Sequence, residues 1–161
     1  MCGIAGYVGD RESADVLVDA LSKLEYRGYD SAGIAVFDHG NIKVKKCKGR
    51  LANLVEKMDE EGKPQGHVGI GHTRWATHGE PSDINSHRNK RVTIVHNGII
   101  ENYKKLKDFL IGEGYSFASE TDTEVAAKLL DYYYDGDPMK TIAKVLSEIK
   151  GSYALGIMFR D

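Results

Sequence analysis

Cysteine is scarce in this sequence, and targeting segments and long apolar runs are missing. The 161 residues include two cysteines, Cys2 and Cys47, too few for the disulfide framework of a small secreted domain. The first residues lack the basic and apolar regions of a signal peptide, and no apolar run approaches the ~18 residues of a transmembrane helix. These absences predict a protein of the reducing cytoplasm.

An excess of charge of one sign is missing as well. A net charge of −2 gives no electrostatic reason to bind nucleic acid or membrane, so we expect neither as a partner. The length suits one domain with a sizeable core, and no internal repeat is visible.

Strands and helices are predicted in groups rather than in strict alternation. Apolar runs rich in β-formers predict strands at residues 2–8, 32–37, 41–47, 67–73, 92–96 and 153–159. Helical spacing of apolar residues predicts helices at residues 12–25, 51–58, 103–110, 121–133 and 138–149. This grouping favours an α+β fold of antiparallel sheets. Because the chain ends directly after a predicted strand, we expect the domain to be truncated at its C-terminal end.

Three residues are predicted to begin helices. Ser13 is a candidate cap, and Thr121 with Glu124 has the spacing of a capping box. Pro138 suits the first position of the last helix.

The start of the chain, Met1-Cys2-Gly3, offers a nucleophile. An initiator Met before a small residue is normally trimmed, which would leave Cys2 with both a thiol and a free α-amino group. A thiol is a good nucleophile near neutral pH, and an α-amine with a pKa of roughly 7.7–8.0 is a useful general base. Coincidence is the better explanation of a cysteine at this position taken alone, so the other motifs decide.

The dipeptide Asn97-Gly98 has two interpretations. Asn-Gly after a strand suits a type I′ hairpin turn. However, the residues that follow lead into a predicted helix rather than a returning strand. Placed at a strand end, the Asn97 amide and the Gly98 N–H would form an oxyanion hole, with two donors aimed at a carbonyl oxygen that gains charge.

Arg74 and Asp122 lie in two predicted polar loops. Either could be an ordinary solvated charge. A ligand with an α-amino-acid head, however, needs a bidentate cation for its carboxylate and an anion for its ammonium group. Arg74 and Asp122 are the smallest set that provides both.

The histidines and the single tryptophan have simpler explanations. A His-ligated metal is one hypothesis, but the spacing fits no familiar zinc motif, so we expect hydrogen-bonding loop histidines and no metal. Trp75 either packs in the core or closes over the site, and Cys47 is expected to be inert. The histidines concerned are His72, His78, His87 and His96.

Together the motifs resemble one family, the class II glutamine amidotransferases, which are N-terminal-nucleophile hydrolases whose mature chains begin with Cys-Gly-Ile. The resemblance spans the whole chain and favours the branch that makes an amino sugar phosphate. A purine-pathway member would be expected to show a His-Arg-Gly-Gln type sequence near position 27. The stretches that carry the resemblance are Leu24-Glu-Tyr-Arg-Gly-Tyr-Asp-Ser-Ala-Gly-Ile34, Gly71-His-Thr-Arg-Trp-Ala-Thr-His-Gly-Glu-Pro81, His96-Asn-Gly-Ile-Ile-Glu-Asn-Tyr103 and Ser119-Glu-Thr-Asp-Thr-Glu124.

The resemblance implies a fold and a chemistry. The fold would be a four-layer αββα sandwich. Cys2 would attack the glutamine side chain and form a γ-glutamyl thioester, with the oxyanion held by Asn97 and Gly98.

Further residues take roles by the same resemblance. The α-carboxylate of glutamine would bind Arg74, and the α-ammonium group would bind Asp122. Thr77 and His78 would lie in a loop that closes over glutamine, Trp75 would gate ammonia transfer, and Arg27 would lie near the nucleophile.

Residues 1–161 are thus interpreted as the N-terminal part of a type 2 glutamine amidotransferase domain, without the sugar-phosphate isomerase domain. The expected partners are glutamine and that isomerase domain, with self-association through unpaired strand edges as a further expectation. No cofactor is expected. The alternative interpretation is a catalytically silent glutamine-binding fragment, which would follow if Met1 is retained or if truncation disrupts the site.

Overall fold

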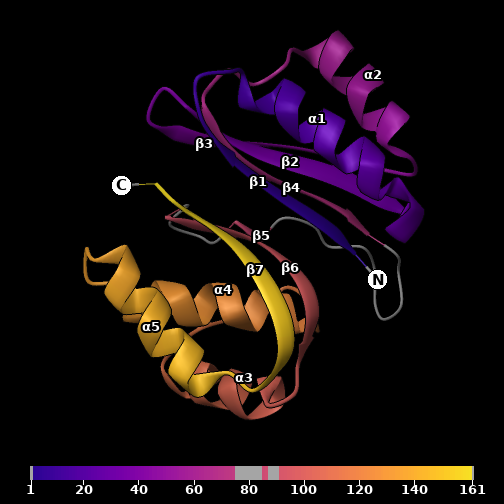
Figure 1. Ribbon diagram of the computed structural model, residues 1–161. Helices are drawn as coiled ribbons and strands as arrows, with labels where there is room; N and C mark the ends of the chain where they lie inside the picture. Colours follow the sequence, from indigo (N-terminus) through magenta and orange to yellow (C-terminus); the bar gives the residue numbers. More distant parts are fainter. Residues whose placement is uncertain (1, 75–84, 87–90, 161) are drawn as a thin grey trace.

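The computed structural model describes residues 2–74, 85–86 and 91–160, and it divides the chain into two halves (Figure 1). The first half contains β1 (Gly3–Val8), α1 (Ser13–Leu24), a short 3-10 helix (Glu25–Arg27), β2 (Ser31–Asp38), β3 (Asn41–Lys48), α2 (Leu51–Glu61) and β4 (Val68–Arg74). The second contains β5 (Asn85–Ser86), β6 (Val92–Ile100), α3 (Tyr103–Gly112), α4 (Asp122–Tyr133), α5 (Pro138–Glu148) and β7 (Gly151–Phe159).

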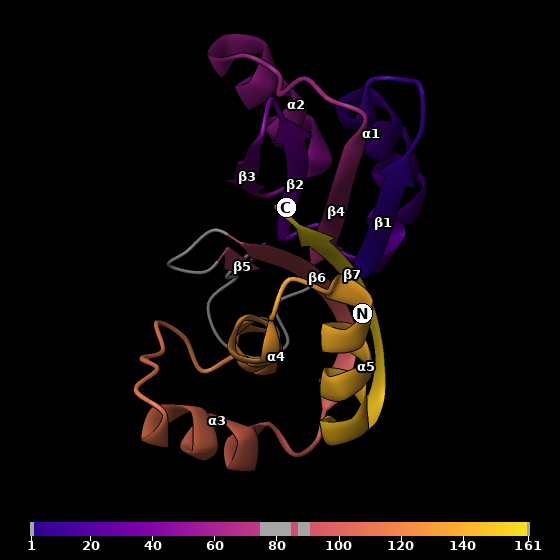
Figure 2. The same cartoon turned by 90° about the vertical axis from the view of Figure 1, so that its left-hand side faces the viewer.

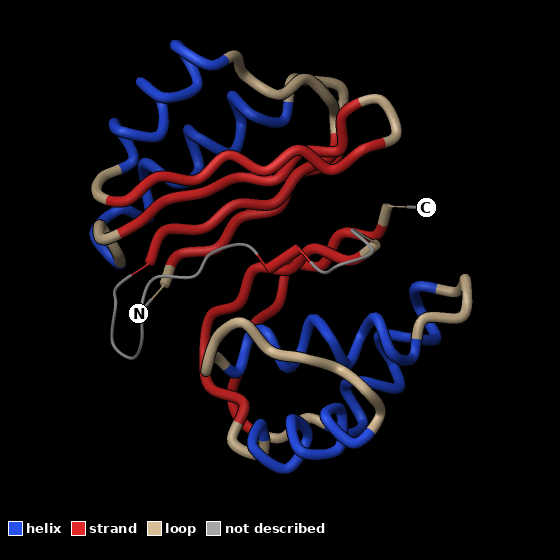
Figure 3. The backbone as a smooth tube through the Cα atoms, turned by 180° about the vertical axis from the view of Figure 1, so that it is seen from behind, coloured by secondary structure: helices blue, strands red, loops and turns tan. Residues whose placement is uncertain are grey.

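The described strands form two antiparallel sheets. One has four strands in the order β1-β4-β2-β3, and the other has three in the order β5-β6-β7. The views from the side and from behind show α1 and α2 outside the first sheet and α3, α4 and α5 outside the second (Figures 2 and 3). The predicted α+β fold with four layers is confirmed.

Each layer boundary has its own apolar core. Leu17 and Leu21 of α1 pack with Leu54 of α2 on the outer face of the first sheet. A smaller cluster lies between the sheets and joins Ala35 and Ile70 of the first to Val95 of the second, with Met158 beside them. Because β2 is covered on both sides, it is buried almost continuously rather than at alternate residues.

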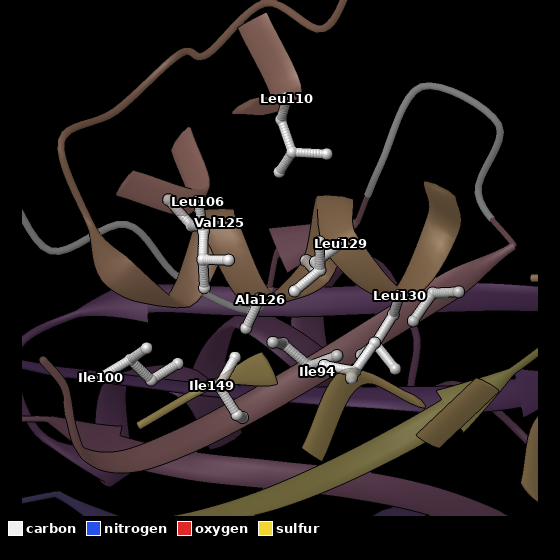
Figure 4. Close-up of a cluster of buried hydrophobic side chains, with 12 residues drawn as sticks. Ile94, Ile100, Leu106, Leu110, Val125, Ala126, Leu129, Leu130 and Ile149 are labelled. Carbon is white, nitrogen blue, oxygen red and sulfur yellow. The ribbon is translucent and has the colours of Figure 1, made fainter. Parts of the chain in front are cut away.

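The largest cluster lies between the second sheet and its helices (Figure 4). Ile94 and Ile100 of β6 meet Val125 and Leu129 of α4 there, and Leu110 adds the contribution of α3. This packing fixes the N-terminus of α4 against β6, which matters for the candidate site. Among the described residues, every helix is too short or too polar to cross a membrane.

Most predicted elements are confirmed, including Thr121 as a cap and Pro138 as the first residue of α5. The prediction for Ser13 is wrong. Ser13 is the first helical residue, and Glu12 precedes the helix with its carboxylate bound to the Gly66 N–H. The short strand β5 was not predicted.

The prediction that Asn97 and Gly98 lie at a strand end is wrong as well. β6 continues to Ile100, because β7 begins two residues earlier than predicted and pairs with it throughout, from Ile100 opposite Gly151 to Val92 opposite Phe159. Arg74 belongs to β4 and Asp122 begins α4, so the prediction that both lie in polar loops is wrong.

Candidate functional site

Cys2 lies directly before β1, on the side of the first sheet that faces the second. Gly3 pairs with Thr73, so Cys2 stands beside the end of β4. Its thiol is free and partly exposed. The main-chain N–H of Cys2 donates a hydrogen bond to Oδ1 of Asn97, with 3.3 Å between nitrogen and oxygen. This bond joins two motifs that are 95 positions apart in the sequence.

Asn97 reaches Cys2 because of the alternation along β6. Val95 faces the cluster between the sheets, and side chains two residues apart in a strand share a face, so Asn97 faces the first sheet. An acceptor oxygen turned to the Cys2 nitrogen leaves the amide nitrogen of Asn97 as a donor for another group.

Gly98 has a backbone that other residues rarely adopt. Its φ is 129°, and a Cβ placed there would lie 2.2 Å from the carbonyl oxygen of Ser152 in β7. A glycine is therefore required at this point of the sheet, next to the residue that contacts Cys2.

Asp122 is the first residue of α4, where the helix dipole favours a negative charge. The Thr121 side chain caps this helix by accepting a hydrogen bond from the Glu124 N–H at 3.3 Å. One carboxylate oxygen of Asp122, Oδ2, accepts a hydrogen bond from the Ile100 N–H at 2.9 Å, which ties the helix to the end of β6. The side chain stays 23% exposed, so it is open to a ligand.

His96 lies on the opposite face of β6 from Asn97, towards α4, with 3% of its side chain exposed. Its Nδ1 is 2.9 Å from the Thr123 hydroxyl and 3.9 Å from Oδ1 of Asp122. Burial lowers the pKa of His96, the charge of Asp122 raises it and the charge of Arg74 lowers it, and the net shift is downward. His96 is therefore neutral at pH 7, and the charges of Arg74 and Asp122 both act on it.

Arg74 ends β4 and is paired with Ser31 of β2. Its carbonyl accepts a hydrogen bond from the Asp30 N–H at 3.0 Å. Gly28 packs on the same backbone so closely that a Cβ there would lie 2.6 Å from the carbonyl carbon of Arg74. The motif at residues 26–33 thus supports the main chain of Arg74.

The remaining predicted residues are less closely connected. Nε of Arg27 donates to the Tyr26 hydroxyl at 2.8 Å, and the guanidinium group lies 5.4 Å from the centre of that ring. Trp75, Thr77 and His78 lie outside the described residues.

The structure also tests the metal hypothesis in part. Within residues 2–74, 85–86 and 91–160, no group of three or more His, Cys, Asp or Glu side chains is arranged to hold a metal ion. His72 and His96 lie in β4 and β6, which confirms the strands predicted at residues 67–73 and 92–96, whereas the general expectation of loop histidines is wrong for both. His78 and His87 are outside the described part.

Three groups near Asp122 make contacts that the sequence did not predict. These are the Ile100 N–H, the hydroxyl of Thr123 and the carboxylate of Glu124. Thr123 and Glu124 belong to the same sequence motif as Asp122, so that motif could have indicated that they lie near the site. The contact of the Ile100 N–H depends on how far β6 extends, which the local sequence did not reveal.

Known proteins resemble this chain along its whole length. Residues 73–161, more than half of the chain, match the family described as glutamine amidotransferase domain. The glutamine–fructose-6-phosphate aminotransferase [isomerizing] of Caldanaerobacter subterraneus subsp. tengcongensis is 58% identical over 165 aligned positions, which cover 100% of this chain and 27% of that protein. A protein of the same name from Thermus thermophilus is 50% identical, with the same coverage.

A solved structure extends the comparison to the fold. The glutamine phosphoribosylpyrophosphate amidotransferase from B. subtilis, complexed with ADP and GMP, superposes with a TM-score of 0.86 at 29% identity. The match covers 99% of this chain and 35% of that one. The chain spans about a quarter of the length of its curated relatives, 27% for each of the two aminotransferases named above.

Proposed function

Because the chain belongs to the glutamine amidotransferase domain family, we propose that it hydrolyses glutamine to glutamate and ammonia with Cys2 as the nucleophile. The observation that carries this proposal is the hydrogen bond between the Cys2 nitrogen and the Asn97 side chain. It supports a reaction centre in which nucleophile, base and oxyanion donor are neighbours.

Removal of Met1 is the first requirement of the proposal. While Met1 is attached, the Cys2 nitrogen is an amide that donates its proton and cannot act as a base. Once Met1 is removed, the same nitrogen is an α-amine with a pKa of roughly 7.7–8.0, which can accept the proton of the thiol. Asn97 Oδ1 would hold that amine in place.

The thiolate sulfur then attacks the side-chain carbonyl carbon of glutamine. The carbonyl oxygen gains the negative charge, and the amide nitrogen of Asn97 and the N–H of Gly98 would donate hydrogen bonds to it. Collapse of the tetrahedral intermediate breaks the carbon–nitrogen bond, and the leaving nitrogen takes the proton from the α-ammonium group of Cys2. Water attacks the resulting γ-glutamyl thioester, which releases glutamate and restores the thiol.

Binding of the substrate head is assigned to two charged residues. Arg74 would bind the α-carboxylate of glutamine and Asp122 the α-ammonium group. Oδ1 of Asp122 lies 3.9 Å from Nδ1 of His96, and the charge of Arg74 also lowers the pKa of His96, which supports a common site for Arg74 and Asp122. Thr77 and His78 would close over glutamine, Trp75 would gate ammonia transfer and Arg27 would support the nucleophile.

The relatives' names suggest the fate of the ammonia. We propose that residues 1–161 belong to the ammonia-supplying half of a glutamine:fructose-6-phosphate aminotransferase, in the cytoplasm. A sugar-phosphate isomerase domain would use that ammonia to make glucosamine 6-phosphate. We also propose that the chain needs no cofactor and binds neither nucleic acid nor membrane. Association of copies of the chain with one another is a separate proposal.

Release of glutamate by the Met1-trimmed protein tests the proposal, with C2A as the variant that should release none. A second function is favoured only if Met1 stays attached, namely glutamine binding without turnover. Intact-mass spectrometry with calorimetry separates the two, because a chain that keeps Met1 and binds glutamine without hydrolysing it would support the second.

A further inference from the structure

The motif that contains Asp122 holds a second acid, Glu124, to which the proposed reaction gives no role. Only 5% of Glu124 is exposed. Its carboxylate turns back from α4 to the segment before the helix. Oε1 accepts a hydrogen bond from the Ala118 N–H at 2.9 Å, and Oε2 accepts from the Ser119 N–H at 2.7 Å and from the Ser119 hydroxyl. One side chain thus binds three donors of this segment.

Lys128, one turn further along α4, completes the arrangement. Only 6% of it is exposed, and its Nζ lies 2.9 Å from Oε1 of Glu124. The same ammonium group donates to the Ser116 carbonyl and lies 4.3 Å from the centre of the Phe117 ring. Glu124 and Lys128 therefore bind the main chain at three of the four residues from 116 to 119.

A buried ion pair is weak evidence of a role in stability. Removing two charges from water offsets much of their attraction, and apolar residues of similar size often serve a core as well. Apolar side chains could not bind the main-chain groups of residues 116–119. Burial raises the pKa of Glu124, but the hydrogen bonds from Ser119, Ala118 and Lys128 outweigh this and lower the pKa overall, so the carboxylate stays ionised at neutral pH.

The segment held in this way leads directly into Asp122. Ser119 contacts the Thr121 hydroxyl at 2.9 Å, and Thr121 caps the helix of which Asp122 is the first residue. On its other side Asp122 is held by the Ile100 N–H at 2.9 Å. The position of the Asp122 carboxylate therefore depends on two contacts. One is its hydrogen bond to β6, and the other is the segment of residues 116–119, which Glu124 and Lys128 hold.

We propose that Glu124 and Lys128 are positioning residues that hold Asp122 where it binds the α-ammonium group of the substrate. This inference rests on the proposed function. Neither side chain contacts glutamine in this account. Their contribution is to selectivity for a substrate that carries an α-amino group.

The test compares two substrates in the natural polypeptide after Met1 removal. One is glutamine and the other is glutaramate, which is glutamine without its α-amino group. We expect E124Q to lower kcat/KM for glutamine about tenfold and to change that for glutaramate less than about twofold, because only glutamine uses Asp122. The ratio of the two values does not depend on the fraction of protein that is folded.

Glu120→Gln is the matched control. It makes the same chemical change in the same motif, but the Glu120 side chain is 91% exposed and pairs with Lys107 at the surface. The ratio should stay at the wild-type value. If E124Q does not fold, S119A decides instead, since it removes the hydroxyl that donates to Glu124 and contacts Thr121, and it should lower the ratio about threefold.

The outcomes separate this inference from the function on which it rests. An equal loss for both substrates in E124Q, or an unchanged ratio in S119A when E124Q does not fold, would overturn the positioning role. A wild-type protein that releases no glutamate would instead overturn the proposed function.

Discussion

The main-chain nitrogen of Cys2 lies 3.3 Å from Oδ1 of Asn97 and donates a hydrogen bond to it across the two sheets. A single side chain can therefore orient two parts of the reaction. Its oxygen holds the nitrogen that becomes the base, and its amide nitrogen remains for the oxyanion. Asn97 is central to both proton transfer and charge stabilisation in this account.

Replacement of Asn97 should therefore reduce turnover. We expect N97A to lower kcat about 10²- to 10³-fold, the typical effect of removing one oxyanion donor. Steady-state glutamate release measures this. Asn53, on α2 at the other side of the first sheet, supplies the control N53A, which should keep the wild-type kcat. A kcat within twofold of wild type in N97A would show that Asn97 is not a donor.

Arg74 and Asp122 should affect binding of the substrate head. We expect R74A and D122A each to raise KM for glutamine by roughly 10- to 100-fold, because each removes a charge-assisted hydrogen bond. An amide substrate without the α-groups should be affected far less. Kinetics with both substrates provide the comparison, and the same loss for both would show that these residues do not bind the head.

Gly98 should tolerate no side chain. G98A combines a backbone at φ 129° with a Cβ 2.2 Å from the Ser152 carbonyl oxygen, so we expect a loss of roughly 2 kcal/mol or more in the free energy of unfolding. Denaturant titration measures it. At Gly112 in α3 the space around a Cβ is open among the described residues, so G112A should leave stability unchanged or raise it slightly. Equal stability of the two variants would contradict the strained geometry.

His96 should make the protein sensitive to mild acid. Its pKa is lowered in the folded state, chiefly by burial, with Arg74 of β4 lowering it and Asp122 of α4 opposing the shift. Above the unfolded pKa of 6.5 both states are neutral and His96 has no effect. As the pH falls below that value, the unfolded state binds a proton that the folded state resists, so stability decreases until the folded-state pKa is passed.

The variant H96Q should lose the part of the decrease in stability at acidic pH that comes from His96. Unfolding midpoints measured at pH 7.5 and 5.5 should differ less for H96Q than for the wild type. The exposed His67 supplies the control H67Q, which should keep the wild-type difference. An identical pH dependence for H96Q and wild type would show that His96 is not buried in its neutral form.

The fold was largely predictable because its elements are locally encoded. Amphipathic spacing, the Thr121 cap and Pro138 set the helices of the second half, and the confirmed grouping of elements gave the α+β fold. The family was recognised from four short motifs taken together, because each motif alone also has an ordinary structural explanation.

The errors arise where distant residues decide the structure. β6 continues through Asn97 and Gly98 because β7, more than 50 residues later, supplies the pairing. Likewise, the burial of His96 depends on α4 packing across it, and the role of Glu124 depends on the path of residues 116–119. Periodicity and composition describe neighbours in sequence, so these relationships were not visible to them.

The central claim is that Cys2, with its own α-amine exposed by removal of Met1, is the nucleophile that hydrolyses glutamine. The most direct measurement is glutamate release by protein whose intact mass shows that Met1 is absent, with C2A prepared in the same way. The wild type should release glutamate, and C2A should release none. Equal rates in the two proteins would contradict it.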